Sequence, residues 1–166
     1  MKMKIRDEKK QDVKAIYELT KAAFAPIDMS DGSEPDIIDR LRKDGDLTVS
    51  LVALKGNEIV GHIAFSPVTI SDQRGYWFGL GPISVQPSQQ RAGIGRQLIE
   101  SGLERIRSLG ADGCVLLGDP SYYGRFGFQS HGDLIYGSVP TEYVQSLSFG
   151  KERAVGELHY SPAFAG

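Results

Sequence analysis

The chain has 166 residues, of which 40% are hydrophobic and 24% are charged, and its formal net charge is -2. This length fits one domain, residues 1–166, whose core needs no disulfide, and the small net charge gives no reason to expect nucleic acid or a membrane as a partner. Cys114 is the one cysteine and no long apolar run follows the N-terminal lysines, so we expect a cytoplasmic protein without a signal peptide or membrane span.

The N-terminal part of the chain predicts a short strand and two amphipathic helices. Residues 3–6 favour the strand, and apolar side chains recur at helical spacing within residues 7–24. Residues 34–45 repeat this pattern, with acidic residues in the first turn, basic residues in the last turn and Gly45 as a stop. The acidic, proline-containing segment 26–35 between the helices is typical of a loop.

After residue 46 the pattern changes to that of a mixed sheet. Apolar runs joined by short polar turns predict an antiparallel meander of three strands, at residues 47–54, 59–70 and 76–85. Pro67 interrupts the second run, which indicates a bulge or an edge there. A helix over residues 93–110 followed by the apolar strand 114–117 predicts a parallel crossover. Further on, the pattern favours one helical turn and then two strands, within residues 121–128, 141–149 and 153–160.

Two glycines, Gly93 and Gly95, lie between the third strand of this meander and the following helix. The first N–H groups of a helix lack partners and carry partial positive charge, so this position favours an anion such as a diphosphate, and glycines let it approach closely. The alternative is a tight turn without a ligand. Two other phosphate-binding patterns do not fit, because Leu98 stands where the dinucleotide-binding fingerprint needs its third glycine and the chain has no Gly-Lys-Ser/Thr sequence.

The turn has the form Gln/Arg-x-x-Gly-x-Gly/Ala over residues 90–95. With ISVQP at 83–87, YYGRFGF at 122–128 and GELHYSPAF at 156–164, the sequence resembles the GNAT superfamily of acyl-CoA-dependent N-acetyltransferases, in its bacterial YhbS-like branch. The resemblance covers essentially the whole chain. It implies an α/β three-layer fold with a central seven-stranded mixed sheet, flanked by helices and splayed between the fourth and fifth strands.

The resemblance also implies acetyl-CoA as cosubstrate and no metal. Backbone amides of the turn would bind the pyrophosphate, with added charge from Arg91 or Arg96, and backbone groups of Ile83 and Val85 would pair with the pantetheine. The amides belong to Gln90, Arg91, Ala92, Gly93, Ile94 and Gly95. The alternatives are plain core packing for the two strand residues and solvated helix charges for the two arginines.

Acyl transfer from a thioester to an amine needs a proton for the departing thiolate, and a phenol with a pKa near 10 can supply it at neutral pH. Tyr123, four residues before Gly127, matches the position of the general acid in the family, and Tyr122 is the second candidate. Aromatic packing near a helix end is the alternative for both. We expect Asp119 to cap the following turn and Cys114 to be a buried, inert thiol.

The general base is less clearly marked. His62 has the right pKa range, and Glu34 and Asp36 belong to the segment that walls the acceptor site in this family, where either could act directly or through water. The alternatives are a satisfied core histidine and an acid placed by the helix dipole.

Acidic side chains crowd the loop and second helix that face the acceptor in this family, which predicts a small cationic amine as acceptor. They are Asp28, Asp31, Glu34, Asp36 and Asp39. A solvated acidic face is the alternative.

Two other function classes stay open at this point, a catalytically silent acyl-CoA sensor and an interaction domain without a cofactor. The sequence is compatible with a homodimer.

Overall fold

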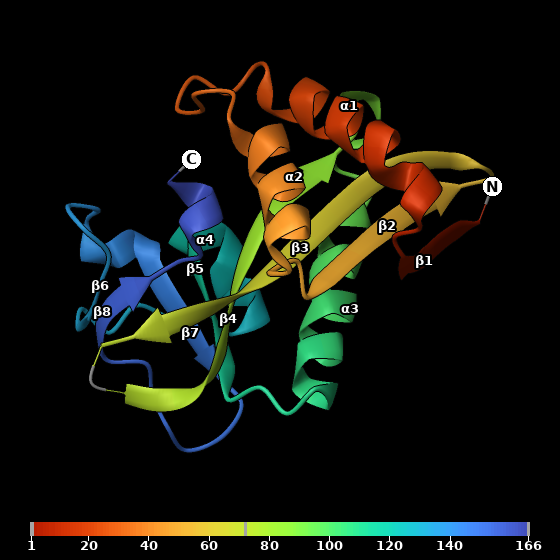
Figure 1. Cartoon of the computed structure of the whole chain (residues 1–166). Coiled ribbons are helices and arrows are strands. Elements are labelled where there is room, and N and C mark those ends of the chain that lie inside the picture. The colour runs from red at the N-terminus through yellow and green to blue at the C-terminus, as the bar shows by residue number, and fades with distance from the viewer. Residues whose placement is uncertain (1, 72, 166) are drawn as a thin grey trace.

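The computed structural model of the chain describes residues 2–71 and 73–165 (Figure 1). Asp72, in one of the predicted turns, lies outside the described residues. The helices and strands are β1 Met3–Asp7, α1 Val13–Phe24, α2 Glu34–Asp44, β2 Val49–Lys55, β3 Glu58–Ile70, β4 Gln73–Val85, α3 Ile94–Ser108, β5 Gly113–Leu117, α4 Pro120–Tyr123, β6 Leu134–Ile135, β7 Val144–Ser148 and β8 Gly156–His159.

The strands form a mixed sheet with the order β1-β2-β3-β4-β5-β7, in which β4 and β5 are parallel and the other pairs are antiparallel. β8 pairs with the last residues of β3, and β6 pairs with β8. The described residues thus form eight strands, one more than the seven expected. The additional strand, β6, has only two residues, which is too short for a periodic pattern to reveal.

The first helix begins later than the pattern suggested. β1 continues to Asp7, and a 3₁₀ turn over Lys10–Asp12 precedes α1. Buried Asp12 accepts a hydrogen bond from the Lys9 N–H and pairs with Arg6 at 2.7 Å, which holds the end of the strand against the start of the helix. The second helix ends as predicted, with Gly45 in the left-handed region at φ 78°.

Helices cover both faces of the sheet (Figure 1). Ile16 of α1 and Ile38 of α2 pack with Val52 on one face. On the other face, the apolar side chains of α3 belong to the larger hydrophobic cluster of the core. Gly102 of α3 permits this close approach, because a Cβ atom there would overlap the ring of Phe65. None of the helices in the described part of the chain is long and apolar enough to cross a bilayer.

The register of β3 and β4 creates the opening on which the site is built. Phe65 pairs with Leu80 and Ile63 with Ile83, so two residues of β4 oppose one residue of β3. β4 pairs with β5 only over Trp77–Gly79, and beyond Gly79 the two strands separate, as the expected splay requires.

Pro67 lies in the part of β3 between its pairing with β2, which ends at Phe65, and its pairing with β8, which begins at Thr69. Its missing N–H therefore falls on an open edge of the strand, one of the two predicted outcomes.

Candidate active site

A cavity of about 670 Å³ lies where β4 leaves β5. Three parts of the chain that are distant in the sequence line it: the end of α1 with the loop after it, the stretch from the end of β4 through the glycine turn to the start of α3, and α4 with the turn that follows. The lining residues are Ala23, Phe24, Ile27, Ile83, Ser84, Val85, Gln90, Arg91, Gly93, Ile94, Gly95, Arg96, Tyr122, Tyr123 and Arg125. The cavity therefore collects nine of the twelve residues predicted for the site.

The glycine turn presents the start of α3 to this cavity. Gly93 is the N-cap residue of α3 with φ 83°, and Arg91 also has a positive φ, of 68°. A Cβ atom at Gly93 would meet nothing within 4 Å, so the backbone angle is what favours glycine there and the space beside it is open. A Cβ atom at Gly95 would lie 3.6 Å from the Tyr122 hydroxyl, an ordinary contact, so this glycine keeps the inner wall clear without being forced by the fold.

The charged side chains that line the cavity are all arginines, namely Arg91, Arg96 and Arg125, and no carboxylate of a described residue lines it. Arg96 forms an exposed ion pair with Glu100 at 2.9 Å, and the Arg125 guanidinium lies 4.7 Å from the centre of the Tyr122 ring. Together with the free N–H groups at the start of α3, these cations make the wall suitable for a diphosphate.

Both candidate tyrosines reach the cavity. The Tyr122 hydroxyl lies beside Gly95, at the start of α3, while the Tyr123 ring packs against Gly118 and Phe128, after the end of β5. Burial raises the pKa of Tyr123 to about 12. Its phenol therefore stays protonated at neutral pH, in the form a general acid needs.

The model of the acetyltransferase (GNAT) domain matches residues 4–130. This chain belongs to the GNAT acetyltransferase family. It is 36% identical over 135 residues to YhbS of Escherichia coli K12, named an uncharacterized N-acetyltransferase, with 80% of this chain and 78% of that protein covered.

Two solved structures of GNAT proteins share the fold. A GNAT family acetyltransferase from Brucella melitensis in complex with acetyl-CoA is 46% identical, with a TM-score of 0.87 and 98% of both chains covered. The Escherichia coli YhbS structure in complex with CoA is 29% identical, with a TM-score of 0.91, and covers 100% of this chain and 93% of that one.

Three of the twelve predicted site residues do not line the cavity. His62 is fully buried on β3, with Nε2 2.7 Å from Ser50 Oγ, and burial lowers its pKa to about 4. Glu34 begins α2 and bonds the Ser30 hydroxyl at 2.5 Å. Ala92 lies in the glycine turn but also does not line the cavity.

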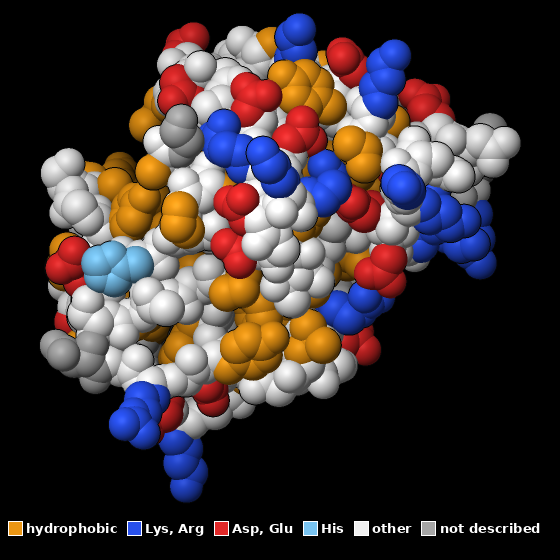
Figure 2. All heavy atoms as spheres, in the orientation of Figure 1, with side chains coloured by type: hydrophobic (Ala, Val, Ile, Leu, Met, Phe, Trp, Pro, Cys, Tyr) orange, Lys and Arg blue, Asp and Glu red, His pale blue; other side chains and the backbone are white. Residues whose placement is uncertain are grey.

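The acidic segment expected to face the acceptor is largely engaged in local contacts. Asp31 accepts from Ser33, Asp36 from Tyr17, and Asp39 pairs with Arg42. Figure 2 shows acidic and basic side chains interspersed over α1 and α2, so this face carries no field of one sign.

Two expected structural roles are confirmed. Cys114 is fully buried, which raises the pKa of its thiol, and Asp119 caps α4 by accepting from the Ser121 N–H at 2.9 Å.

Five lining residues were not predicted from the sequence: Ala23, Phe24, Ile27, Ser84 and Arg125. Ser84 sits between two predicted lining residues and Arg125 lies inside the aromatic signature, so both had a local signal. The α1 residues had none, because only the packing of α1 over β4 brings them to the opening.

Proposed function

We propose that this chain transfers an acetyl group from acetyl-CoA directly to a primary amine of a small molecule. We also propose that residues 1–166 form one N-acetyltransferase domain and that it acts in the bacterial cytoplasm. The observation that carries the proposal is one cavity at the β4/β5 opening, which joins an anion-binding helix start to a protonated tyrosine. The acetyl-CoA and CoA complexes of its GNAT relatives support the same cosubstrate.

The turn and the free edge of β4 would hold the cosubstrate. Amide groups of residues 90–95 bind the pyrophosphate, and Arg91, Arg96 and Arg125 add positive charge. Beyond Gly79 the edge of β4 that faces the opening has no strand partner among the described residues, so backbone groups near Ile83 and Val85 are placed to pair with the pantetheine amides.

The reaction needs one acid and one base. The amine nitrogen attacks the thioester carbonyl carbon, the C–S bond breaks, and Tyr123 donates its phenolic proton to the departing thiolate. The raised pKa of Tyr123 keeps that proton in place until the thiolate forms. Neither Glu34 nor His62 lines the cavity, so either of them would have to act on the amine through another group.

For the acceptor we propose a small amine that contacts apolar side chains. Ala23, Phe24 and Ile27 form the cavity wall on the α1 side, and this wall carries no charge. The prediction of a cationic acceptor depends on the acidic residues of the α1–α2 segment. These residues do not line the cavity.

The test is release of free CoA thiol from acetyl-CoA with small amines, amino acids, aminoglycosides and lysine peptides at low and high salt. We expect turnover with at least one small amine. A preference for cationic amines that weakens with salt supports the charge argument, and a preference for uncharged or anionic acceptors contradicts it. Tight acetyl-CoA binding without thiol release from any amine would identify a sensor and overturn the proposed function.

A further inference from the structure

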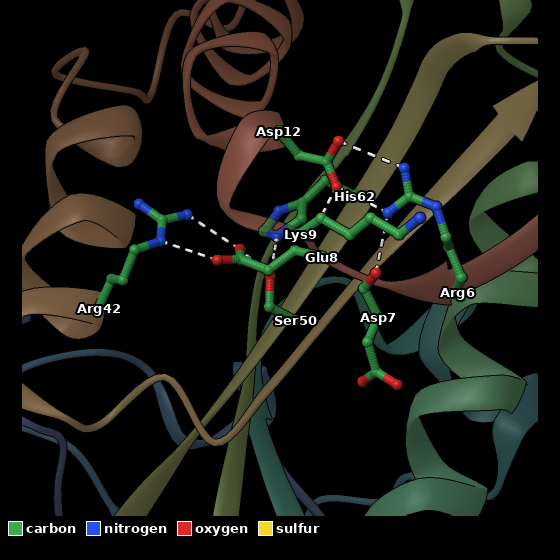
Figure 3. A network of polar contacts seen from close by, with 8 residues as sticks. All are labelled: Arg6, Asp7, Glu8, Lys9, Asp12, Arg42, Ser50 and His62. Atoms are coloured by element: carbon green, nitrogen blue, oxygen red, sulfur yellow. Dashed lines mark hydrogen bonds and ion pairs between the residues drawn. The ribbon is translucent and has the colours of Figure 1, made fainter.

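A chain of polar contacts runs through the sheet from the end of β1 to the neighbourhood of the cavity (Figure 3). Arg42 of α2 binds the Glu8 carboxylate with two hydrogen bonds, both of 2.9 Å. Glu8 accepts a bond of 2.5 Å from the Ser50 hydroxyl, and Ser50 Oγ lies 2.7 Å from His62 Nε2. The residue after β1, two strands and a helix therefore meet in one continuous line of hydrogen bonds.

The contacts determine where each proton sits. Burial would raise the pKa of Glu8, but the bonds from Arg42 and Ser50 outweigh it and the pKa is lowered, so Glu8 is an acceptor only. The single proton of Ser50 must then point to Glu8, and Ser50 must accept from His62. His62 consequently carries its proton on Nε2, and its Nδ1 presents a bare lone pair.

His62 is paired across the sheet with a residue that lines the cavity. His62 lies directly opposite Ser84 in the register of β3 and β4, which puts the Cβ atoms of such a pair about 4.5–5.5 Å apart. Ser84 lines the cavity. His62 Nδ1 and Ser84 Oγ are both buried and have no hydrogen-bond partner among the described residues, so an unpartnered ring nitrogen and an unpartnered hydroxyl belong to paired residues of neighbouring strands.

The other end of the line opens to solvent. Glu8 and Arg42 line a separate hollow of about 230 Å³, together with Thr48 and Ser50. The Glu8 side chain is 17% exposed. A proton that reaches Glu8 can therefore leave the molecule at a surface distinct from the cavity.

We propose that Ser84, His62, Ser50 and Glu8 form a proton relay that removes the proton released by the acceptor amine and delivers it to solvent beside α2. The relay rests on the proposed acetyl transfer and supplies its missing base. In this relay His62 acts on the substrate through Ser84. The relay also explains why a buried histidine outside the cavity is linked through Ser50 to the Glu8 carboxylate.

The transfer balances at each step. The amine nitrogen gives its proton to Ser84 Oγ as the C–N bond forms, and Ser84 gives its own proton to His62 Nδ1. His62 Nε2 passes its proton to Ser50, which protonates Glu8, and Glu8 releases it to water. The bond between Ser84 and His62 is not made in this structure, and such bonds commonly tighten only when substrate is bound.

The surroundings keep His62 neutral at physiological pH, because burial lowers its pKa to about 4. The charged groups that act on it are Glu8, which follows β1, and Arg42 of α2. Across β2 it pairs with Val52 and its ring contacts the Ser50 hydroxyl, and across β4 it pairs with Ser84. The buried residues of α1 on this side do not titrate; they are Ile16, Leu19, Thr20 and Ala23.

The test compares His62→Gln, Ser50→Ala and Ser84→Ala with wild type, using the best small amine from the thiol-release panel. Gln retains an N–H donor for Ser50 but has no basic nitrogen. We expect kcat at neutral pH to fall by about 10²-fold for His62→Gln and at least tenfold for the other two, with the KM for acetyl-CoA unchanged. We also expect the rate of His62→Gln to recover as pH rises, because hydroxide replaces the base.

Ser66→Ala is the matched control for Ser84→Ala. Ser66 lies in β3 and, like Ser84, is a buried serine whose hydroxyl has no partner among the described residues. It should retain wild-type kcat. Wild-type kcat and an unchanged pH profile in both His62→Gln and Ser50→Ala would overturn the relay while leaving acetyl transfer intact. Loss of acetyl-CoA binding or of turnover in the wild-type protein would instead overturn the proposed function.

A second measurement is independent of any acceptor. Nitrogen-15 NMR of the imidazole in the wild-type protein should show a neutral His62 with its proton on Nε2 from about pH 5.5 to 8. In Ser50→Ala this tautomer preference should weaken. A proton found on Nδ1 in the wild-type protein would overturn the relay even if the variants lose activity, because the lone pair would then face away from Ser84.

Discussion

The ring of Tyr122 stands at 90° to the ring of Tyr123, with 4.9 Å between their centroids. The two side chains meet different parts of the cavity wall, with the Tyr122 hydroxyl beside Gly95 at the start of α3 and the Tyr123 ring beside Gly118 after β5. This arrangement allows the roles of the two residues to be separated by single substitutions.

Tyr123→Phe removes the proposed proton donor while keeping the aromatic contacts. We expect kcat to fall by about 10²–10⁴-fold and the Kd for acetyl-CoA to change little, as measured by thiol release and by calorimetric titration. Tyr122→Phe is the control and should lose much less. If Tyr122→Phe were the more damaged variant, the general acid would be Tyr122.

Gly93→Glu should abolish acetyl-CoA binding. A carboxylate at the start of α3 would face the pyrophosphate, and juxtaposed like charges cost several kcal/mol, which corresponds to a loss of about 10²-fold or more. Gly110→Glu is matched for backbone strain, because Gly110 also has a positive φ, of 91°, and an open Cβ position at the other end of α3. Calorimetry on both folded variants checks this. Wild-type affinity in Gly93→Glu would contradict the phosphate-binding turn.

Gly102→Ala should destabilise the fold although alanine favours helices. The added Cβ atom would overlap the Phe65 ring, and overpacking of this kind costs about 1–3 kcal/mol. Gly95→Ala in the same helix has only ordinary contacts and measures the helix propensity alone. Urea unfolding gives both values. An unchanged or higher free energy of unfolding for Gly102→Ala would show that α3 shifts away from the sheet.

Asp12→Asn should weaken the fold in a pH-dependent way. The hydrogen bond from Arg6 lowers the pKa of Asp12 despite burial, so the carboxylate stabilises the folded state above the unfolded pKa near 3.9. This contribution is lost as pH falls through the lower, folded pKa.

We expect Asp12→Asn to lower the free energy of unfolding by about 1–3 kcal/mol at pH 7, with a difference from wild type that shrinks toward zero as pH falls below the folded pKa. Urea unfolding over a pH series measures it. Asp7→Asn, which removes an exposed pair with Arg105, should have a much smaller effect. A difference for Asp12→Asn that stayed constant with pH would contradict the role of its charge.

The sequence alone determined the helices, the long strands and the glycine turn. Their signals are short-range: the apolar period of α3, the left-handed stop at Gly45 and the cap at Asp119 each lie within a few residues, and local backbone energetics favour them wherever the segment is placed. Local signals also marked most of the cavity lining, because the end of β4, the turn and the start of α3 are consecutive in the chain.

Only the tertiary structure decided which other side chains join them. Phe24 reaches the cavity because α1 packs over β4, and Ser84 adjoins His62 because a bulge sets the register of β3 against β4. Glu8 and Ser50 are 42 residues apart in sequence, and no local period relates them. Strand register, helix packing and burial act between distant segments, so the polar line through the sheet and the neutral state of His62 exist only once the chain has folded.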